Sequence, residues 1–213
     1  MFTIVDTPHK GRGVFAIQPL SKDTIILKEY PFLLAEDAYD AIYQMYGQLS
    51  IMDSDDIVSD DTAIDSIANI QAQFESLVPY KMDELIITYL EIEEHIATLP
   101  QYMEDFFRNM KPNRLRLLIA KFYRNAFRNQ RDISAPPSAV LIQGALLNHS
   151  CANNIDFYVD RTGHFIFQTN RDIITGEELC NTYLDTILSI KKRQLQLRTQ
   201  YGFICTCTKC SKK

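Results

Sequence analysis

The pattern of apolar and polar positions begins with two segments that favour β-strands. Gly11–Ile17 follows a glycine-flanked turn, and Thr24–Leu34 is rich in β-branched and aromatic residues, although Pro31 interrupts it. The beginning of the chain is therefore predicted to be β-structure.

The apolar positions take up helical spacing from about Asp37 to Arg131. Within this block, Asp53–Asp65 contains six aspartates and is predicted to be a loop or a frayed helix start. Three prolines mark expected helix boundaries, namely Pro79, Pro100 and Pro112. We interpret the block as a helical insertion into a β framework.

The segment Asn113–Arg131 is predicted to form one helix with a buried stripe. Five apolar residues recur along it at helical spacing: Leu115, Leu118, Ile119, Phe122 and Ala126. The basic residues fall mostly outside this stripe: Arg114, Lys121, Arg124, Arg128 and Arg131. Asn125 falls within it, where an unpartnered carboxamide would cost about 1–3 kcal/mol. Either a structural hydrogen-bond partner or a ligand would remove that cost.

After Pro136 and Pro137 the chain returns to short elements. A short apolar helix, a β-hairpin, a short strand and a charged helix are predicted in that order. Their ranges are Val140–Leu147, Ile155–Val159 with Phe165–Thr169, the segment from Gly176 to about Tyr183, and Thr186–Gln200.

Length and hydropathy limit the classes of protein. The 213 residues suffice for a sizeable core, and no apolar run approaches the roughly 20 residues that span a bilayer. Met1–Leu20 lacks the charged-then-apolar pattern of a secretory leader. We therefore expect an intracellular protein, cytoplasmic or nuclear, that does not enter a membrane.

Charge is distributed unevenly along the chain. Residues 1–105 hold 5 Lys/Arg and 20 Asp/Glu, whereas residues 106–213 hold 17 and 7. The acidic half disfavours general nucleic-acid binding and would attract a basic peptide. Solvated helix faces are the simpler explanation for most of these acids.

Three of the five cysteines lie together at the end of the chain, as Cys205, Cys207 and Cys210. This spacing supplies three thiolates to a tetrahedral zinc ion, which needs one more ligand. Of the two remaining cysteines, we predict that Cys151 completes the site and that Cys180 is an unligated thiol. Disulfides would need an oxidising compartment and would leave one cysteine over, and scattered thiols are the remaining alternative.

Two polar stretches are further candidates for a site. In Lys10-Gly-Arg-Gly13 the glycines allow a close approach of the backbone to a ligand, but a turn between strands explains them equally well. In Asn148-His-Ser-Cys151, the histidine is a candidate metal ligand or general base. Ser150 lacks the flanking glycines of a hydrolase nucleophile, so we disfavour a hydrolase.

In their order along the chain, these motifs resemble a SET-domain lysine methyltransferase. They are Gly11-Arg-Gly-Val-Phe-Ala, Asn148-His-Ser-Cys, Gly176-Glu-Glu-Leu with Tyr183 seven residues on, and Tyr201-Gly-Phe203 before Cys-x-Cys-x-x-Cys. The spacing is most similar to the SMYD-type branch, in which an Asn-Ala-Phe-like segment (Asn125-Ala-Phe127) comes earlier. The resemblance covers residues 8–34 and 114–210.

The chain departs from the SMYD-type pattern in two places. No cysteine occurs between Met1 and Ser150, so the MYND zinc finger of that branch is missing. Asn153 stands where the family has a proline after Cys-x. The substrate rules of the branch therefore carry over poorly.

The resemblance implies an α+β fold, with a SET-domain β framework of small sheets, a helical insertion and a zinc-bound C-terminal post-SET tail. Residues 1–36 and 111–200 would form the two parts of the SET domain. Residues 37–110 would form the insertion and residues 201–213 the tail.

The same resemblance assigns roles to individual residues. Tyr183 would be the catalytic residue, and Tyr201 would line the channel for the substrate lysine. Six residues would contact the cofactor S-adenosylmethionine: Lys10, Arg12, Asn125, Asn148, His149 and Phe203. Four cysteines would hold a structural zinc ion: Cys151, Cys205, Cys207 and Cys210.

The activity implied is methyl transfer from S-adenosylmethionine to a protein lysine, histone or non-histone, by a monomer. The partner would be a lysine-containing protein or peptide, such as a basic histone tail, with no direct nucleic-acid binding. One alternative is a catalytically inactive SET-like scaffold that binds peptide, and another is a zinc-stabilised adaptor unrelated to methylation. A scaffold has no need of Tyr183, Asn148, His149 and Tyr201 together, so their presence favours the enzyme.

Overall fold

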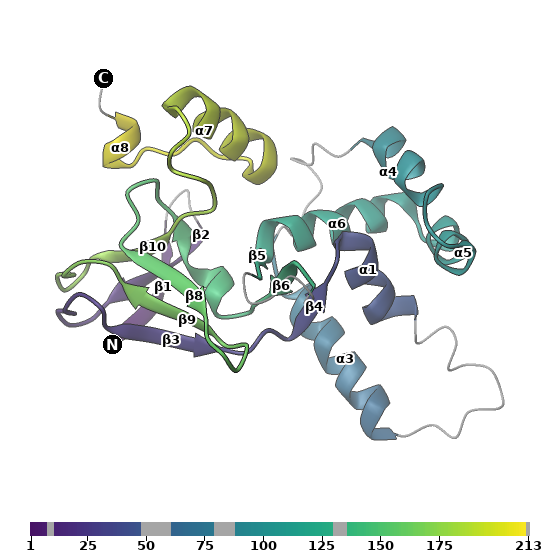
Figure 1. The fold of residues 1–213 in the computed structure, drawn as a ribbon, viewed down its shortest axis with the longest axis horizontal. Coiled ribbons are helices and arrows are strands. Elements are labelled where there is room, and N and C mark those ends of the chain that lie inside the picture. The colour runs from purple at the N-terminus through teal and green to yellow at the C-terminus, as the bar shows by residue number, and fades with distance from the viewer. Residues whose placement is uncertain (8–10, 48–60, 79–87, 130–135, 212–213) are drawn as a thin grey trace. The chain divides into compact units, whose positions relative to one another are not determined.

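The chain folds into two units that interleave in the sequence (Figure 1). The computed structural model describes residues 1–7, 11–47, 61–78, 88–129 and 136–211. Unit 1 comprises the described residues of Met1–Pro31, Asn129–Ile133 and Leu141–Lys213, and unit 2 those of Phe32–Arg128 and Ser134–Val140. The predicted segments (1–36, 37–110, 111–200 and 201–213) were defined by family motifs, whereas these units are defined by compactness. The predicted boundaries therefore stay a prediction.

Unit 1 contains a four-stranded sheet in the order β1-β2-β10-β7. Its strands are β1 (Phe2–Thr7), β2 (Gly11–Ala16), β10 (Glu178–Asn181) and β7 (Asn148–His149). β2 pairs antiparallel with β1 and β10, whereas β10 and β7 are parallel. The predicted early strand is confirmed, and β1, which was not predicted, covers its edge.

The second sheet of unit 1 has the order β3-β9-β8. Its strands are β3 (Ile25–Glu29), β9 (Phe165–Thr169) and β8 (Ile155–Val159). β8 and β9 form the predicted hairpin, with Ile155 opposite Thr169 and Val159 opposite Phe165. The Asp160 carboxylate accepts the backbone N–H groups of Thr162 and His164 at 2.8 and 3.0 Å and so closes the turn.

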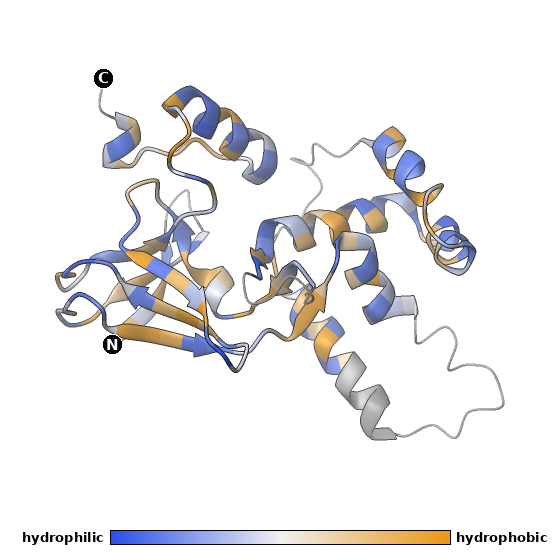
Figure 2. Cartoon of the chain, in the orientation of Figure 1, coloured by the Kyte–Doolittle hydropathy of each residue, from blue (hydrophilic) through white to orange (hydrophobic). Residues whose placement is uncertain are grey.

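The apolar residues of both sheets form the core of unit 1, and they are coloured orange in Figure 2. β2 and β10 contribute Val14, Ala16 and Leu179, and β8 and β9 contribute Ile155, Phe165 and Phe167, all of which are buried. Burying side chains of this size supplies the main stabilisation of so small a pair of sheets.

Unit 2 contains the helices and a short sheet in the order β4-β6-β5. The strands are β4 (Leu33–Ala35), β6 (Ser138–Val140) and β5 (Ala126–Arg128). The helices are α1 (Ala38–Ile42), the π-helical turn η1 (Tyr43–Gly47), α3 (Asp61–Glu75), α4 (Tyr89–Ile96), α5 (Gln101–Asn109) and α6 (Pro112–Asn125).

Two of the three predicted proline boundaries are confirmed. Pro100 is the N-cap residue of α5, and Pro112 is the first residue of α6. Pro79 and residues 53–60 of the aspartate-rich segment lie outside the described residues. The remainder of that segment, from Asp61, belongs to α3.

The helix predicted over Asn113–Arg131 ends earlier, at Asn125. The next residues form β5, which pairs with β6, so sheet pairing overrides the helical pattern. The apolar stripe predicted for this helix is buried as far as Phe122, and Ala126, in β5, is partly buried. Lys121 was predicted outside the stripe, yet it is only 2% exposed. Its Nζ donates to the backbone carbonyls of Glu75, at 2.9 Å, and Leu77, so it caps the end of α3.

The apolar helix predicted over Val140–Leu147 is wrong. Val140 ends strand β6, and only a 3₁₀ turn, η2 (Gly144–Leu146), follows. Gln143 and Gly144 interrupt the apolar run, and only its first residue, Val140, pairs with β4 and β5 in the strand.

The C-terminal region contains α7 (Ile190–Gln196), a π-helical turn η3 (Leu197–Tyr201) and α8 (Thr208–Ser211). The predicted charged helix therefore starts four residues later than Thr186, at Ile190, after the N-cap Ser189. Within the residues that the structure describes, no helix is long and apolar enough to cross a membrane.

Candidate functional site

The backbone that leads into the Asn148 motif is held by one carboxylate. Glu29, at the end of β3, accepts the backbone N–H groups of Ile142, Gln143 and Gly144 at 2.7, 3.0 and 2.8 Å. A Cβ at Gly144 would lie 2.7 Å from the Phe167 ring, so only glycine permits this approach. Together these contacts fix the turn from which Leu147 and Asn148 emerge.

Asn148 joins three strands through its side chain. Its Nδ2 donates to the backbone carbonyl of Arg12 in β2 at 2.9 Å and to Glu178 Oε1 in β10 at 2.8 Å. A Cβ at Gly13 would meet Glu178 Oε1 at 3.0 Å and Asn148 Nδ2 at 3.3 Å, which explains the second glycine of the Gly-Arg-Gly motif. The carboxamide of Asn148 is therefore structural, and its backbone is what remains for a ligand.

Asn154 holds the loop after the Asn148 motif against β10. It is 3% exposed, its Oδ1 accepts the Cys180 backbone N–H at 2.8 Å, and its Nδ2 donates to Glu177 Oε1 and to the Glu178 carbonyl at 3.0 and 2.9 Å. Asn154 was not among the predicted site residues. Its position three residues after Cys151, in a run of two asparagines, was the available signal.

Four predicted site residues come together as an aromatic group. The ring of Tyr183 lies 4.9 Å from that of Tyr201 and 5.2 Å from that of His149, measured between centroids. Phe203 lies 5.9 Å from His149 and 6.4 Å from Tyr201. They come from the segment after β10, from η3 and the tail, and from β7, so the fold gathers distant parts of the sequence.

The Tyr183 hydroxyl has a defined donor role. It donates its hydrogen bond to the backbone carbonyl of Leu147 at 2.8 Å. Burial, and secondarily the neighbouring Tyr201, raises the pKa of Tyr183 above its ordinary value. The hydroxyl is therefore neutral at physiological pH, with its proton directed to Leu147 and its oxygen lone pairs available to another group.

His149 contacts both the aromatic group and a cysteine. Its Nδ1 accepts the backbone N–H of Tyr183 at 3.0 Å, and its Nε2 lies 3.3 Å from Cys151 Sγ. Burial, and then the charge of Arg193, lowers the pKa of His149 to about 4. The ring is therefore neutral, and His149 is not among the grouped side chains that could hold a metal ion.

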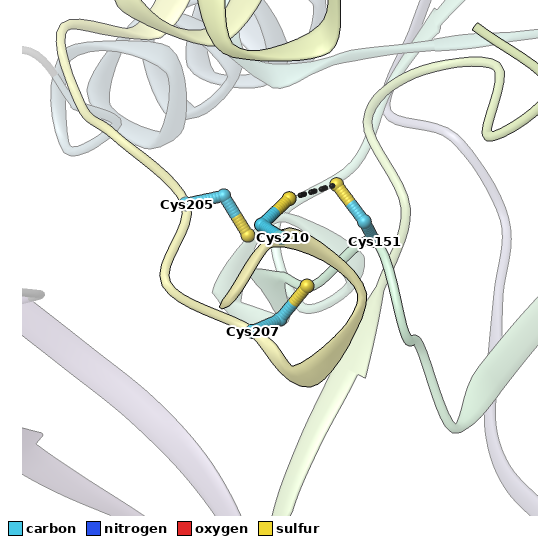
Figure 3. A group of neighbouring side chains, drawn as sticks. All are labelled: Cys151, Cys205, Cys207 and Cys210. Carbon is cyan, nitrogen blue, oxygen red and sulfur yellow. Dashed lines mark hydrogen bonds between the residues drawn. The ribbon is translucent and has the colours of Figure 1, made fainter. Parts of the chain in front are cut away.

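The four predicted ligand cysteines converge. The sulfur atoms of Cys151, Cys205, Cys207 and Cys210 all lie within 4.8 Å of one another and point to a common centre (Figure 3). Cys210 Sγ donates to Cys151 Sγ at 3.5 Å. Zinc–sulfur bonds of about 2.3 Å in a tetrahedron place sulfurs roughly 3.8 Å apart, so this group could hold a metal ion. Cys180, in β10, does not belong to it, and the chain contains no disulfide.

The thiols of this cluster differ in acidity. Burial acts to raise the pKa of Cys207, but hydrogen bonds to its sulfur outweigh burial and lower it; they come from Cys205 and from the backbone of Cys210, Lys209 and Ala152. Burial and the hydrogen bond with Cys210 raise the pKa of Cys151. Hydrogen bonds that favour a thiolate also favour a metal ligand at Cys207.

A buried cation lies beside the cysteine cluster, and its charge indicates whether a metal ion is compatible with these residues. Arg193, in α7, is 6% exposed and its Nη2 lies 3.9 Å from Cys210 Sγ. Its Nη1 donates to the carbonyls of Thr186, at 3.4 Å, and Leu188, and its Nε is buried without a hydrogen-bond partner. Within the described ranges no carboxylate pairs with it. Four thiolates around a divalent ion carry a net charge of −2, which would compensate this guanidinium, so the residues fit a metal.

Three predicted cofactor residues remain, namely Arg12, Asn125 and Lys10. Arg12 is exposed in β2. Asn125 belongs to unit 2, where its Nδ2 donates to the carbonyls of Val78 and Lys121 at 2.6 and 2.7 Å, so a structural partner for the buried carboxamide exists. Its role toward a cofactor stays a prediction. Lys10 lies outside the described residues.

Asn181 is a polar residue of the site that the sequence analysis missed. It is 2% exposed in β10, opposite His149 and two residues before Tyr183. Both its Oδ1 and its Nδ2 are buried without a hydrogen-bond partner. An unpartnered buried carboxamide costs about 1–3 kcal/mol, so it marks a place where a polar ligand would be stabilising.

The comparisons with known proteins agree with this arrangement. The family model described as SET domain matches residues 11–184. The SET domain-containing protein L678 of Acanthamoeba polyphaga mimivirus is 29% identical over 208 residues, which cover 94% of this chain and 74% of the viral protein.

Shorter matches include the histone-lysine N-methyltransferases SET5 of Candida albicans and SMYD3 of Homo sapiens, at 40% and 44% identity over 37% and 31% of this chain. These matches span only 17% and 15% of the two enzymes.

Solved structures show the same fold. The structure described as Rubisco LSMT bound to AdoMet has a TM-score of 0.60 at 15% identity, and the SET domain of LSMT bound to lysine and AdoHcy has 0.59 at 14%. They cover 96% and 95% of this chain, which spans about half of theirs, 52%. With the family model matching most of its length, the chain belongs to the SET domain family.

Proposed function

We propose that this protein transfers a methyl group from S-adenosylmethionine to the ε-amino group of a lysine side chain in a protein substrate. The observation that carries the proposal is the Tyr183 hydroxyl, whose half-buried ring packs among aromatic rings and which donates its hydrogen bond to Leu147. The names of the relatives, which include histone-lysine N-methyltransferases, support the reaction class. The AdoMet and AdoHcy of the neighbouring structures support the cofactor.

Tyr183 would orient the substrate amine. Because its proton is directed to the Leu147 carbonyl, its oxygen can accept an N–H from the incoming amino group. This contact would turn the nitrogen lone pair toward the electrophile, and such positioning supplies much of the acceleration in a displacement. A raised pKa makes the Tyr183 hydroxyl stay protonated, so it stabilises charge and does not act as the general base.

The aromatic surroundings would prepare the nucleophile. A lysine ammonium has no lone pair and must lose its proton before it attacks. The rings of Tyr183, Tyr201 and Phe203 carry no charge, so they form an apolar environment. Such an environment disfavours the charged ammonium form of the lysine. Tyr201 would thereby line the lysine channel.

S-adenosylmethionine would supply a methyl group activated by its sulfonium. Its partners would be Lys10, Arg12, Asn125, Phe203 and the backbone of Asn148 and His149. The fit is supported by Asn181, whose unpartnered carboxamide lies in register with His149 and can donate to and accept from a polar ligand. Phe203 is half-buried and could stack on the adenine ring.

A zinc ion would be structural. Cys151, Cys205, Cys207 and Cys210 would complete its tetrahedral shell without leaving a position for substrate, as closed sites do. Such an ion would join the tail to the Asn148 motif and would hold Tyr201 and Phe203 against Tyr183.

The test is transfer of label from radioactive S-adenosylmethionine to proteins of a cell extract, followed by identification of the labelled band and residue. We expect labelled lysine. Cofactor binding measured by calorimetry without transfer to any protein or peptide would support the inactive scaffold instead.

A further inference from the structure

Both ring nitrogens of His149 are engaged, and they face different parts of the molecule. Nδ1 accepts the backbone N–H of Tyr183 at 3.0 Å. Nε2 lies 3.3 Å from Sγ of Cys151, one of the four converging cysteines. One side chain thus touches the residue proposed to orient the amine and a residue proposed to hold the metal.

The two contacts fix the tautomer of His149. A backbone N–H can only donate, so Nδ1 must be the unprotonated acceptor. A neutral imidazole then carries its proton on Nε2, and this N–H donates to the Cys151 sulfur. The side chain is 7% exposed, so water offers no ready substitute for either hydrogen bond.

The surroundings make the link stiff. β7 is only two residues long, and His149 lies in parallel register with Asn181 of β10. Cys151 and Cys205 are buried with Leu184 and Leu197, and Tyr183, Tyr201 and Phe203 pack against this group. Because the His149 ring is closely packed, a change in the cysteine cluster would displace it, since the ring has no free space in which to rotate.

We propose that His149 is a positioning residue that couples the metal-binding cysteines to Tyr183, by donating its Nε2–H to Cys151 and holding the Tyr183 backbone at Nδ1. The link to methyl transfer rests on the proposed function, whereas the link to the cysteines does not. A metal-bound thiolate accepts a stronger hydrogen bond than a thiol, so occupation of the cluster strengthens the grip of His149 on Cys151.

Two substitutions distinguish the effect of the two His149 hydrogen bonds from the effect of the packing of its ring. His149→Phe keeps a ring of similar size and removes both bonds. His149→Gln keeps an amide N–H at the reach of Nε2, so it retains the donor to Cys151 while losing the acceptor at Nδ1. His164→Phe, in the turn between β8 and β9, is the matched control, since it removes a histidine remote from the cysteines.

The first measurement is Zn²⁺ retention by the full chain against a competing chelator. Partners of metal ligands typically contribute 10–100-fold to affinity, so His149→Phe should bind Zn²⁺ about 10–100-fold more weakly. His149→Gln and His164→Phe should stay within about threefold of the unmodified protein. Equal retention by His149→Phe and the unmodified protein would overturn the proposal.

The second measurement is ¹⁵N NMR of the unmodified Zn²⁺-loaded protein, which needs no variant to fold. We expect His149 as the Nε2–H tautomer, and a shift of the Tyr183 amide signal when Zn²⁺ is exchanged for Cd²⁺. That shift should shrink in His149→Gln, which cannot hold the Tyr183 N–H. A protonated Nδ1, or a Tyr183 amide indifferent to the exchange, would contradict the coupling.

A third measurement, the single-turnover rate of methyl transfer, tests whether the contacts of His149 affect the reaction. With saturating cofactor and peptide, His149→Gln should lower the single-turnover rate at retained Zn²⁺, whereas His164→Phe should not. Unchanged turnover in His149→Gln would limit His149 to metal retention and overturn its positioning of Tyr183. Absence of transfer by the unmodified protein would contradict the proposed function alone, because the metal and NMR results stand apart from turnover.

Discussion

A single hydroxyl separates a methyltransferase from a binding scaffold in this site. The Tyr183 oxygen lies among aromatic rings, and its proton is held by Leu147. Tyr183→Phe keeps the ring and removes only this group, so folding and zinc content should hardly change. Turnover should fall roughly 10²-fold or more, as for other single preorganised donors. Single-turnover methyl transfer at saturating cofactor measures this directly.

The control is another tyrosine of the same unit. Tyr158→Phe removes a hydroxyl from β8 at a position that is 46% exposed, and it should leave the rate unchanged. If Tyr183→Phe and Tyr158→Phe are equally active, Tyr183 has no part in the chemistry.

The same substitution should change the free energy of unfolding in opposite directions at Asn181 and at Asn154. Asn181 carries a buried carboxamide without partners, so Asn181→Leu should raise the free energy of unfolding by about 1–3 kcal/mol in the absence of ligand. Asn154 makes three hydrogen bonds, so Asn154→Leu should lower it. Urea titration of both variants measures the two shifts. A destabilised Asn181→Leu would show that this carboxamide is satisfied in the folded protein.

The sequence predicts the chemistry-bearing residues better than it predicts the residues that position them. The four cysteines could be named from their spacing, and Tyr183 and His149 from the resemblance to SET-domain methyltransferases. Their roles stay a prediction. Glu29 could not be named, because a carboxylate that accepts backbone N–H groups 113 to 115 residues away has no local signature. Lys121 shows the same limit, since its partners at the end of α3 lie 44 and 46 residues away.

At the scale of elements, strong local patterns succeeded and short apolar runs failed. The β8–β9 hairpin has two short apolar-rich runs with the turn Asp160-Arg-Thr-Gly163 between them, and its predicted bounds are those of the structure. The run Val140–Leu147 contains Gly144, a turn signal that the prediction of a helix passed over. The segment after Asn125 has helical spacing. Both were decided by pairing of β6 with β4 and β5, which comes from distant sequence.

Helix α7 contributes a charge to the cysteine cluster, which leads to a prediction. Arg193→Met keeps much of the apolar stem and removes the guanidinium that would balance a net charge of −2. We expect the variant to lose zinc faster than the unmodified protein during dialysis against a chelator, with zinc per chain measured by emission spectroscopy. Lys192→Met, at the exposed neighbouring position of the same helix, should retain it. Full retention by Arg193→Met would mean that the cluster needs no compensating cation.

At the scale of the whole molecule, the proposed site in unit 1 is assembled from both ends of the chain. β2 and the Asn148 motif are 136 residues apart in the sequence, yet the Asn148 side chain reaches Arg12 directly. Such contacts close very long loops, so they form late and depend on the whole unit being folded. Ligands of this unit should therefore stabilise the unit as a whole.

The last prediction concerns S-adenosylmethionine and Asn125. A ligand that binds only the folded state at 100 times its Kd adds about 2.7 kcal/mol, which raises the melting temperature by roughly 5–10 °C in a protein of this size. NAD and ATP should give no shift. Asn125→Ala loses the buried hydrogen bonds to Val78 and Lys121, so its melting temperature without ligand should fall.

The ligand-induced shift, and not the starting temperature, reports on binding by Asn125. If the Asn125 oxygen accepts from the amino-acid end of the cofactor, the shift caused by S-adenosylmethionine should shrink in Asn125→Ala. Asn109→Ala, which removes an exposed side-chain hydrogen bond in α5, should retain the full shift. A lowered starting temperature with an undiminished shift would make Asn125 a structural residue of unit 2, held by its two carbonyl partners alone.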